Sequence, residues 1–224
     1  EIPLRLVGSE MCIRDRIYTA EQAQQYFNGT ELSDPLLIAD MDKAVQAIEA
    51  AVDNEIKITV YGDYDCDGVT STVMLFTHLD AIGADVNWYI PTREEGYGLN
   101  ENAIRKLHED GTGLIITVDN GVSAVNEAEL IYELGMKLVV TDHHQLPEIL
   151  PKAEAIVNPH RQDDNSPYKE LAGCGVALKL IMALERDVEG VLEQYADLAA
   201  IGTIGDVVAL TGENRIIVKR GLLE

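Results

Sequence analysis

The sequence predicts an α/β fold, in which an open parallel sheet carries helices on both faces and is followed by a helical C-terminal portion. Short apolar runs rich in Val and Ile alternate with stretches of helical periodicity over residues 56–157. After Gly175 these short runs stop and helical periodicity continues. Strands that alternate with helices are typical of parallel βαβ units, because the crossover between two parallel strands carries a helix.

Two helices are expected before the alternating part. Thr19 is a suitable N-cap for a short helix that Asn28 and Gly29 would end. Residues 40–54 carry apolar side chains at helical spacing, at Met41, Val45, Ile48 and Val52. Both stretches are therefore predicted to be helical.

The alternating part is expected to contain short, buried strands, each followed by polar or glycine-containing residues. We expect strands at 56–61, 86–90, 114–118, 137–141 and 155–157, with helices at 70–82, 101–110 and 124–134. The stretch from Asp163 to Pro167 is expected to be a loop. Helices at 176–186, 191–204 and 215–222 are expected after it.

These patterns divide the chain into segments. Residues 1–16 are expected to be a non-native or disordered leader, because Leu4 to Arg16 resembles translated adapter sequence. Residues 17–55 are the predicted N-terminal helical segment, and residues 56–212 are the predicted α/β domain. Residues 213–224 are predicted to begin a further helix. The family resemblance described below implies that this helix links to a further C-terminal domain and that the chain is a catalytic core that need not be active alone.

Acidic residues outnumber basic ones. The chain has 224 residues, with 39 Asp and Glu against 17 Lys and Arg, and its formal net charge is −22. Apolar residues make up 46%, which is typical of a folded protein and not of a disordered acidic chain. The sequence lacks the roughly 20-residue apolar run of a membrane helix. It also lacks the basic surplus of a protein that binds nucleic acid by charge alone. Its 3 cysteines favour the reducing cytoplasm.

The densest chemical feature follows the first predicted strand, where Asp63, Asp65 and Asp67 occupy alternate positions. In an extended segment alternate side chains point the same way, so we expect two or three of these carboxylates to converge on one point. Converging carboxylates repel one another unless a cation lies between them, and hard divalent cations prefer oxygen ligands. A solvated acidic turn is the alternative, because Asp and Gly are common turn residues.

Two more predicted strands end in polar residues. Asp119 follows strand 114–118, and Asp142, His143 and His144 follow strand 137–141. The carboxyl ends of parallel strands meet at one edge of a sheet, where open α/β folds bind ligands. The sequence therefore predicts a metal site at this edge.

A further acid, Asp206, is isolated in an apolar and small-residue run after Gly205. A buried acid needs a partner or a metal. A helix cap is equally compatible with this position, and the pattern leaves both interpretations open.

Other motifs of nucleotide-binding and hydrolytic proteins are absent from the sequence. It has no GxxxxGK[ST] phosphate loop and no GxSxG elbow. Gly173-Cys174-Gly175 lacks the third glycine of a dinucleotide fingerprint. Asp65 and Asp67 also fit the DxDG[TV] start of haloacid-dehalogenase-type phosphatases. That fold places its nucleophile directly at a strand end, whereas here residues 62–64 separate the predicted strand from Asp65. It would also leave Asp142, His143 and His144 without a role.

Four motifs in this order resemble those of the DHH phosphoesterase superfamily: GDYDCDG, VDNG, TDHH and IGTIGDVVAL. The flanking stretches REEGYGLN, NPHR, LAGCGVALKL and GENRIIVKRGL are similar to those of the RecJ-like single-stranded-DNA-specific exonucleases. The resemblance runs from about Ser33 onward and assigns residues 56–212 to a DHH domain. It implies a hydrolase with two divalent cations, Mn²⁺ or Mg²⁺.

The resemblance also implies roles for individual residues. The metal ligands would be Asp65, Asp67, Asp119, His143 and Asp206. Asp142 would orient the site, His144 would reach the substrate phosphate, and Asp63 would be a supporting acid. Pyrophosphatase members carry a histidine where this chain has Tyr61, which weakens a pyrophosphatase interpretation. The nucleic-acid backbone would be held by Arg93, Tyr97, His160, Arg161, Gly173 and Gly175, for each of which a purely structural role is equally compatible with the sequence.

The function implied by the resemblance is 5′→3′ exonuclease activity on single-stranded DNA in DNA recombination and repair. Single-strand-binding protein and a helicase would be its partners, with no membrane association and a monomeric state. A DHH-type phosphodiesterase of nanoRNA or cyclic dinucleotides is the alternative within the superfamily. A non-catalytic DHH scaffold is a third interpretation, disfavoured because all four motifs keep their acids.

Overall fold

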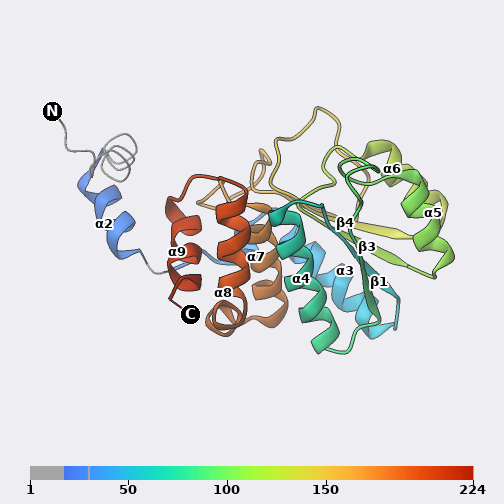
Figure 1. Ribbon diagram of the computed structural model, residues 1–224, viewed down its shortest axis with the longest axis horizontal. Helices are drawn as coiled ribbons and strands as arrows, with labels where there is room; N and C mark the ends of the chain where they lie inside the picture. The colour runs from blue at the N-terminus through green and yellow to red at the C-terminus, as the bar shows by residue number, and fades with distance from the viewer. Residues whose placement is uncertain (1–17, 30, 224) are drawn as a thin grey trace. The chain divides into compact units, whose positions relative to one another are not determined.

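The computed structural model describes residues 18–29 and 31–223 (Figure 1). The chain divides into two compact units, Glu1–Glu31 and Leu32–Glu224. In the first unit, helix α2 (Ala20–Asn28) begins directly after Thr19, as predicted. The leader expected at residues 1–16 lies outside the described residues.

The second unit is built on a parallel sheet. Its strands are β1 (Ile58–Tyr61), β2 (Val86–Tyr89), β3 (Leu114–Val118), β4 (Lys137–Thr141) and β5 (Ala155–Val157). They lie in the order β2-β1-β3-β4-β5, and every neighbouring pair is parallel. The predicted α/β class is therefore confirmed.

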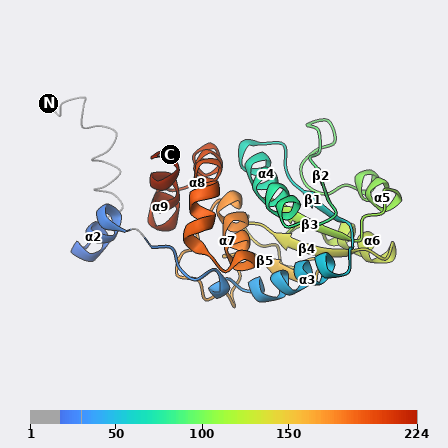
Figure 2. The same cartoon turned by 90° about the horizontal axis from the view of Figure 1, so that it is seen from below.

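Alternate strand residues fill two separate cores, one on each face of the sheet. On one face, Ile58, Val60 and Ile116 pack with helices α3 (Met41–Asp53), α4 (Cys66–Ala81) and α7 (Gly173–Glu185). On the other face, Tyr61 and Ile115 pack with α5 (Glu101–Glu109) and α6 (Val125–Glu133). Figure 2 shows the sheet between these two layers. Strands β1, β3 and β5 are buried along their whole length, and burial on both faces explains their largely apolar runs, whereas the edge strand β2 is only partly buried.

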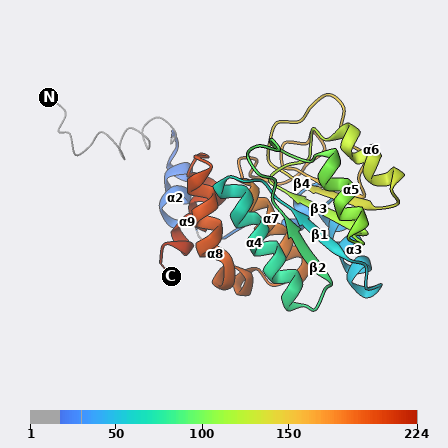
Figure 3. The same ribbon diagram turned by 45° about the vertical axis from the view of Figure 1, so that its right-hand side comes forward.

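Helices α8 (Val188–Gly205) and α9 (Gly212–Gly221) complete the helical portion. Figure 3 shows α8 between α9 and the pair formed by α4 and α7. Within residues 18–29 and 31–223, no helix has the length and apolar character of a membrane span.

The helix starts are where prediction and structure differ most. Helix α4 begins at Cys66, not near residue 70, because the Asp65 side chain accepts a hydrogen bond from the Gly68 amide and caps it. Helix α7 begins at Gly173, not at residue 176. A short 3₁₀ helix, η2 (Pro35–Leu37), was not predicted.

The strand order places a topological switch point between β1 and β3. The chain leaves β1 toward β2 on one side, while β3, which pairs with the other side of β1, leads to β4. Helices on opposite faces therefore diverge at this point and leave a crevice outside the carboxyl ends of the strands. The acid-rich segments after β1 and β3 both end in this crevice.

A buried ion pair joins α7 to α9. Lys179 Nζ lies 2.7 Å from Glu213 Oε2, and the two side chains are 1% and 8% exposed. Lys179 Nζ also donates a hydrogen bond to the Ser33 carbonyl oxygen, at 2.6 Å. The pair therefore fastens the helical portion to the segment before η2.

We expect Lys179→Ala to lower the free energy of unfolding by about 3–5 kcal/mol, because it leaves the Glu213 carboxylate buried without its cation. Urea denaturation followed by circular dichroism measures this change. Arg105→Ala is the matched control: it removes the exposed Arg105–Glu101 pair, and exposed pairs contribute about 0–1 kcal/mol. Equal losses in the two variants would contradict the role of burial.

Candidate metal centre

The loop after β1 delivers three carboxylates, but they do not converge on one point. Asp63 is buried and Asp65 is exposed, and both precede α4. Asp67 lies in the first turn of α4, where the backbone is helical. The expected extended segment is therefore wrong at Asp67, because the helix begins at Cys66, whereas two of the three carboxylates, those of Asp63 and Asp65, do lie together. Asp63 and Asp65 point toward Asp119, whereas Asp67 groups with His143 and Asp206.

The N-terminus of α7 holds the Asp67 carboxylate. Asp67 Oδ2 accepts a hydrogen bond from the Gly173 amide at 2.6 Å, and Oδ1 accepts one from the Cys174 amide at 2.8 Å. Free amides at a helix N-terminus favour negative charge. The fully buried Asp67 is thereby fixed in its orientation.

Asp119 has an unusual backbone. Its φ is 61°, in the left-handed region that a non-glycine residue adopts at a cost. The Asn120 side-chain amide supports this turn by donating to the Tyr61 and Val118 carbonyl oxygens, at 3.3 and 2.9 Å. Gly173 leaves room for the acid, since a Cβ there would lie 2.6 Å from Asp119 Oδ1.

Asp142 organises the segment after β4. Its Oδ1 accepts from the amides of His143 and His144 at 2.7 and 3.0 Å, and from His144 Nδ1 at 2.7 Å. Its Oδ2 accepts from the Val122 amide at 3.1 Å. Burial alone would raise the pKa of Asp142, but these hydrogen bonds, led by that from His144, lower it. The same bond raises the pKa of His144.

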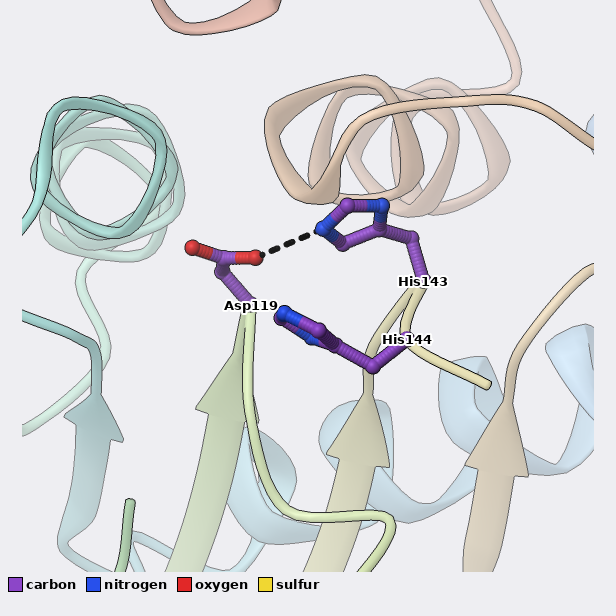
Figure 4. Close-up of side chains that lie close together, drawn as sticks. All are labelled: Asp119, His143 and His144. Atoms are coloured by element: carbon purple, nitrogen blue, oxygen red, sulfur yellow. Dashed lines mark ion pairs between the residues drawn. The ribbon is translucent and has the colours of Figure 1, made fainter. Parts of the chain in front are cut away.

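The His143 ring is the point where the acidic groups meet. Its Nε2 lies 3.1 Å from Asp119 Oδ1, 3.6 Å from Asp206 Oδ2 and 3.9 Å from Asp67 Oδ2. Figure 4 shows Asp119 and His143 pointing toward each other from the ends of neighbouring strands, with His144 beside them. Three groups have ligand atoms within 4.8 Å of one another: Asp119, His143 and His144; Asp67, His143 and Asp206; Asp63, Asp65 and Asp119.

These groups fit a divalent cation. Among the described residues, Asp63 Oδ1, Asp119 Oδ1 and His143 Nε2 are buried atoms that make no hydrogen bond. Burial and the nearby charges of Asp67 and Asp65 raise the pKa of Asp119 to about 10. Burial also raises the pKa of Asp63 and of Asp206. Carboxylate oxygens and an imidazole nitrogen that lack partners are suited to Mn²⁺ or Mg²⁺.

The cap interpretation of Asp206 is confirmed, and its role as a metal ligand stays a prediction with which its position is compatible. It is the C-cap of α8, directly after Gly205, and its carboxylate faces His143. The helix end therefore positions the acid in the centre.

Two of the residues expected to bind substrate lie beside the centre. The Tyr97 hydroxyl donates to the Asp119 carbonyl oxygen at 3.0 Å and lies 3.2 Å from His144 Nδ1. The Arg93 guanidinium lies over the ring of Tyr64, at 5.0 Å from its centroid. The sequence analysis does not predict a role for Tyr64. Its position between the two acids Asp63 and Asp65 is the sequence feature that places it next to the candidate metal centre.

The remaining expected substrate residues are less directly connected to the centre. His160 and Arg161 line a cavity of about 670 Å³ with Gln145 and Gln162. Arg161 pairs with Asp40 and Asp163, and its side chain is 13% exposed. Gly173 contacts Asp119 as described, while a Cβ at Gly175 would lie 3.1 Å from Leu171 Cδ2. Substrate binding by these residues stays a prediction.

The fold and the centre together define a doubly wound α/β domain with a carboxylate–histidine cluster at its switch point. The chain belongs to the DHH family: residues 57–203 match the description "DHH family, N-terminal domain". This confirms the resemblance seen in the four motifs.

Among the similar proteins are several described as RecJ exonucleases. The single-stranded-DNA-specific exonuclease RecJ of Bacillus subtilis (strain 168) is 45% identical over 207 residues, which cover 91% of this chain and 26% of that protein. RecJ of Escherichia coli (strain K12) is 39% identical over 199 residues, which cover 83% and 34%. A crystal structure of exonuclease RecJ bound to manganese superposes with a TM-score of 0.76 at 41% identity, covering 86% of this chain and 49% of the other. The chain thus spans less than half the length of these relatives.

We expect the affinity for Mn²⁺ to rise with pH between 6 and 8, by about tenfold per unit if one proton is displaced. The raised pKa of Asp119 means that a proton competes with the cation. Titration calorimetry at several pH values measures this. Asp119→Asn should lose most of the affinity, whereas Asp80→Asn, at an exposed position of α4, should retain it. Unchanged affinity in Asp119→Asn would contradict the assignment.

The same acid predicts a pH dependence of stability without metal. An unfolded Asp has a pKa of about 3.9, whereas that of Asp119 is raised to about 10 in the folded chain. Between these values the folded state holds more protons, so its stability is greatest at low pH and falls as pH rises. In chelator, the parent should lose stability from pH 5 to pH 8 more steeply than Asp119→Asn. Parallel curves from urea denaturation would refute this.

Proposed function

We propose that this chain is the catalytic core of a metal-dependent phosphodiesterase that hydrolyses single-stranded DNA from its 5′ end. The observation that carries the proposal is the position of Asp119, whose carboxylate belongs to two of the candidate metal groups and contacts the third through His143. A shared carboxylate is suited to bridging two cations. Two-metal sites of this kind serve hydrolysis of phosphate esters.

We assign one cation to Asp63, Asp65 and Asp119, and the other to Asp67, His143 and Asp206, with Asp119, which lies 3.1 Å from His143 Nε2, as the carboxylate available to both. When bound, the two cations would supply the positive charge that lowers the pKa of a water and stabilises the oxygens of the phosphate. This assignment agrees with the ligands implied by the family motifs and moves Asp63 from a supporting role to a ligand. Its buried, unpartnered Oδ1 supports that change.

His144 is suited to holding the substrate phosphate. Asp142 fixes the ring through Nδ1 and raises its pKa, so the protonated form persists to higher pH than in a free histidine. The ring is about half exposed, at 45%. Its Nε2–H would therefore donate to a phosphate oxygen, while the Tyr97 hydroxyl lies beside Nδ1, at 3.2 Å.

The identity of the substrate rests on the relatives. Their names describe exonucleases specific for single-stranded DNA, and the identity of 45% extends over 91% of this chain. Arg93, exposed beside Tyr64, is a basic side chain near the centre that is suited to contacting the DNA backbone. Phosphodiesterase activity on nanoRNA or cyclic dinucleotides is the competing substrate class.

The phosphatase alternative has less support. In haloacid-dehalogenase-type phosphatases the nucleophilic acid directly follows a strand, but here β1 ends at Tyr61 and Asp65 caps α4. That mechanism also leaves the cluster around His143 without a role. The scaffold alternative is disfavoured because acids of three motifs, Asp67, Asp119 and Asp206, converge on the histidine of the remaining one.

The finer expectations remain part of this proposal. They are the domain boundaries at residues 16, 55 and 212, a cytoplasmic location, a monomeric state, and partnership with single-strand-binding protein and a helicase. They rest on the family motifs and, for the location, on the low cysteine content.

Digestion of 5′-labelled DNA tests the proposal. We expect release of mononucleotides from the 5′ end of single strands with Mn²⁺, no release with chelator, and little release from blunt duplexes. Asp119→Asn should lower the rate by on the order of 100-fold or more, since a metal centre contributes several kcal/mol to transition-state stabilisation. Asp80→Asn is the matched control and should keep the parent rate.

The outcomes separate the alternatives. Release from the 3′ end would defeat the proposed polarity, and preference for dinucleotides in a substrate panel would favour the competing phosphodiesterase. An aspartyl-phosphate on Asp65 would favour the phosphatase. Failure to bind Mn²⁺ would favour the scaffold.

A further inference from the structure

The last turn of α8 carries two glycines, Gly202 and Gly205, directly before the candidate ligand Asp206. Glycine inside a helix costs about 0.5–1 kcal/mol relative to alanine. Figure 3 shows α8 beside α4 and α7, whose N-terminal turns hold Asp67. Two helix-destabilising glycines in one turn therefore indicate that neighbouring elements pack too closely there for a side chain.

Gly202 lies against the side chains that surround Asp67. A Cβ at Gly202 would lie 2.3 Å from Thr70 Oγ1, 2.7 Å from Cys174 Sγ and 2.9 Å from Asp67 Oδ1. These separations are shorter than van der Waals contact. Any larger residue at position 202 would therefore displace the carboxylate of Asp67. Asp67 belongs to the same candidate metal group as His143 and Asp206.

Gly205 lies against the first residue of α4. A Cβ at Gly205 would lie 2.7 Å from Cys66 Sγ and 2.8 Å from Cys66 Cβ. The Cys66 thiol also lies 3.7 Å from the Ile201 carbonyl oxygen, so it packs along the same turn of α8. Asp206 follows Gly205 without an intervening residue, and a displacement of this turn would move its carboxylate away from His143.

We propose that Gly202 and Gly205 are positioning residues of the metal centre, which bring the C-terminal turn of α8 close enough to α4 and α7 for Asp206 to share a cation with Asp67 and His143. This inference rests on the metal centre proposed above. The glycines act through the position of Asp206 and do not contact substrate. Their hydrogens in place of methyl groups set the spacing of the ligand group.

The test is a double-mutant cycle on Mn²⁺ affinity. Gly205→Ala should weaken Mn²⁺ binding at least about tenfold, the size of effect that misplacing the support of a ligand produces. Adding Cys66→Gly removes both atoms that the new methyl group would meet, so the double variant should recover most of the affinity. Cys66→Gly alone should bind Mn²⁺ like the parent. Titration calorimetry on the folded chains gives the affinities, and circular dichroism confirms folding.

Gly221→Ala is the matched control. A Cβ at Gly221 would lie 2.1 Å from the Ala196 carbonyl oxygen and 2.7 Å from Ala200 Cβ, at the contact of α9 with α8. This variant should lose stability, seen as a lower melting temperature, without a comparable loss of Mn²⁺ affinity. It separates general damage to helix packing from displacement of Asp206.

Each outcome decides between the two proposals. A parent chain that fails to bind Mn²⁺ would refute the proposed metal centre itself. A parent that binds, together with a Gly205→Ala chain that binds equally well, would overturn only the role of the glycines. If Gly205→Ala does not fold, recovery of folding and affinity in the double variant supports the contact with Cys66, and no recovery overturns it.

Discussion

The repulsion among carboxylates at the carboxyl edge of the sheet is the constraint on which the rest of the site depends. Asp63, Asp67 and Asp119 are almost completely buried within one crevice. Burial disfavours the charged form of each acid, and its neighbours add to the cost. The raised pKa of Asp119 reports that cost directly. A bound cation would offset this cost, because an opposite charge favours the ionised form of each acid. The surrounding helix ends and loops hold the acids close together.

Three helix ends and one buried acid hold the ligands apart. The N-terminus of α7 donates two amides to Asp67, and Asp65 caps α4. The C-terminus of α8 presents Asp206. Asp142, which is supplied with hydrogen bonds from the backbone, fixes the two histidines and is not a member of any candidate metal group. In the proposed centre the orientations of Asp65, Asp67 and His144 are therefore supported by hydrogen bonds before a cation binds, which reduces the reorganisation that binding requires.

The sequence predicted the sheet better than the helix starts, for a physical reason. Strands 114–118, 137–141 and 155–157 match the structure because they are buried on both faces and read as continuous apolar runs. The start of α4 at Cys66 was missed because Asp65 serves as an N-cap, whereas the alternating acids suggested an extended segment. Asp119, Asp142 and the two histidines were recognised because they directly follow β3 and β4. The division of the candidate ligands into separate groups depends on α7 and α8, which lie more than 100 residues farther along the chain than Asp67, and no local pattern encodes such contacts.

The net charge of −22 does not determine the electrostatic field at the site. On composition alone it argues against a polyanionic substrate such as DNA. At physiological ionic strength, however, exposed charges farther than about 8 Å from a phosphate are largely screened. Under the proposed function, what a phosphate would meet at this edge of the sheet is set by the nearest groups: the two cations, the ring of His144, whose pKa is raised by Asp142, and the guanidinium of Arg93. The acids that make the chain anionic are, at this edge of the sheet, the ligands that concentrate positive charge. The local field at the reacting phosphate thus has the opposite sign from the total.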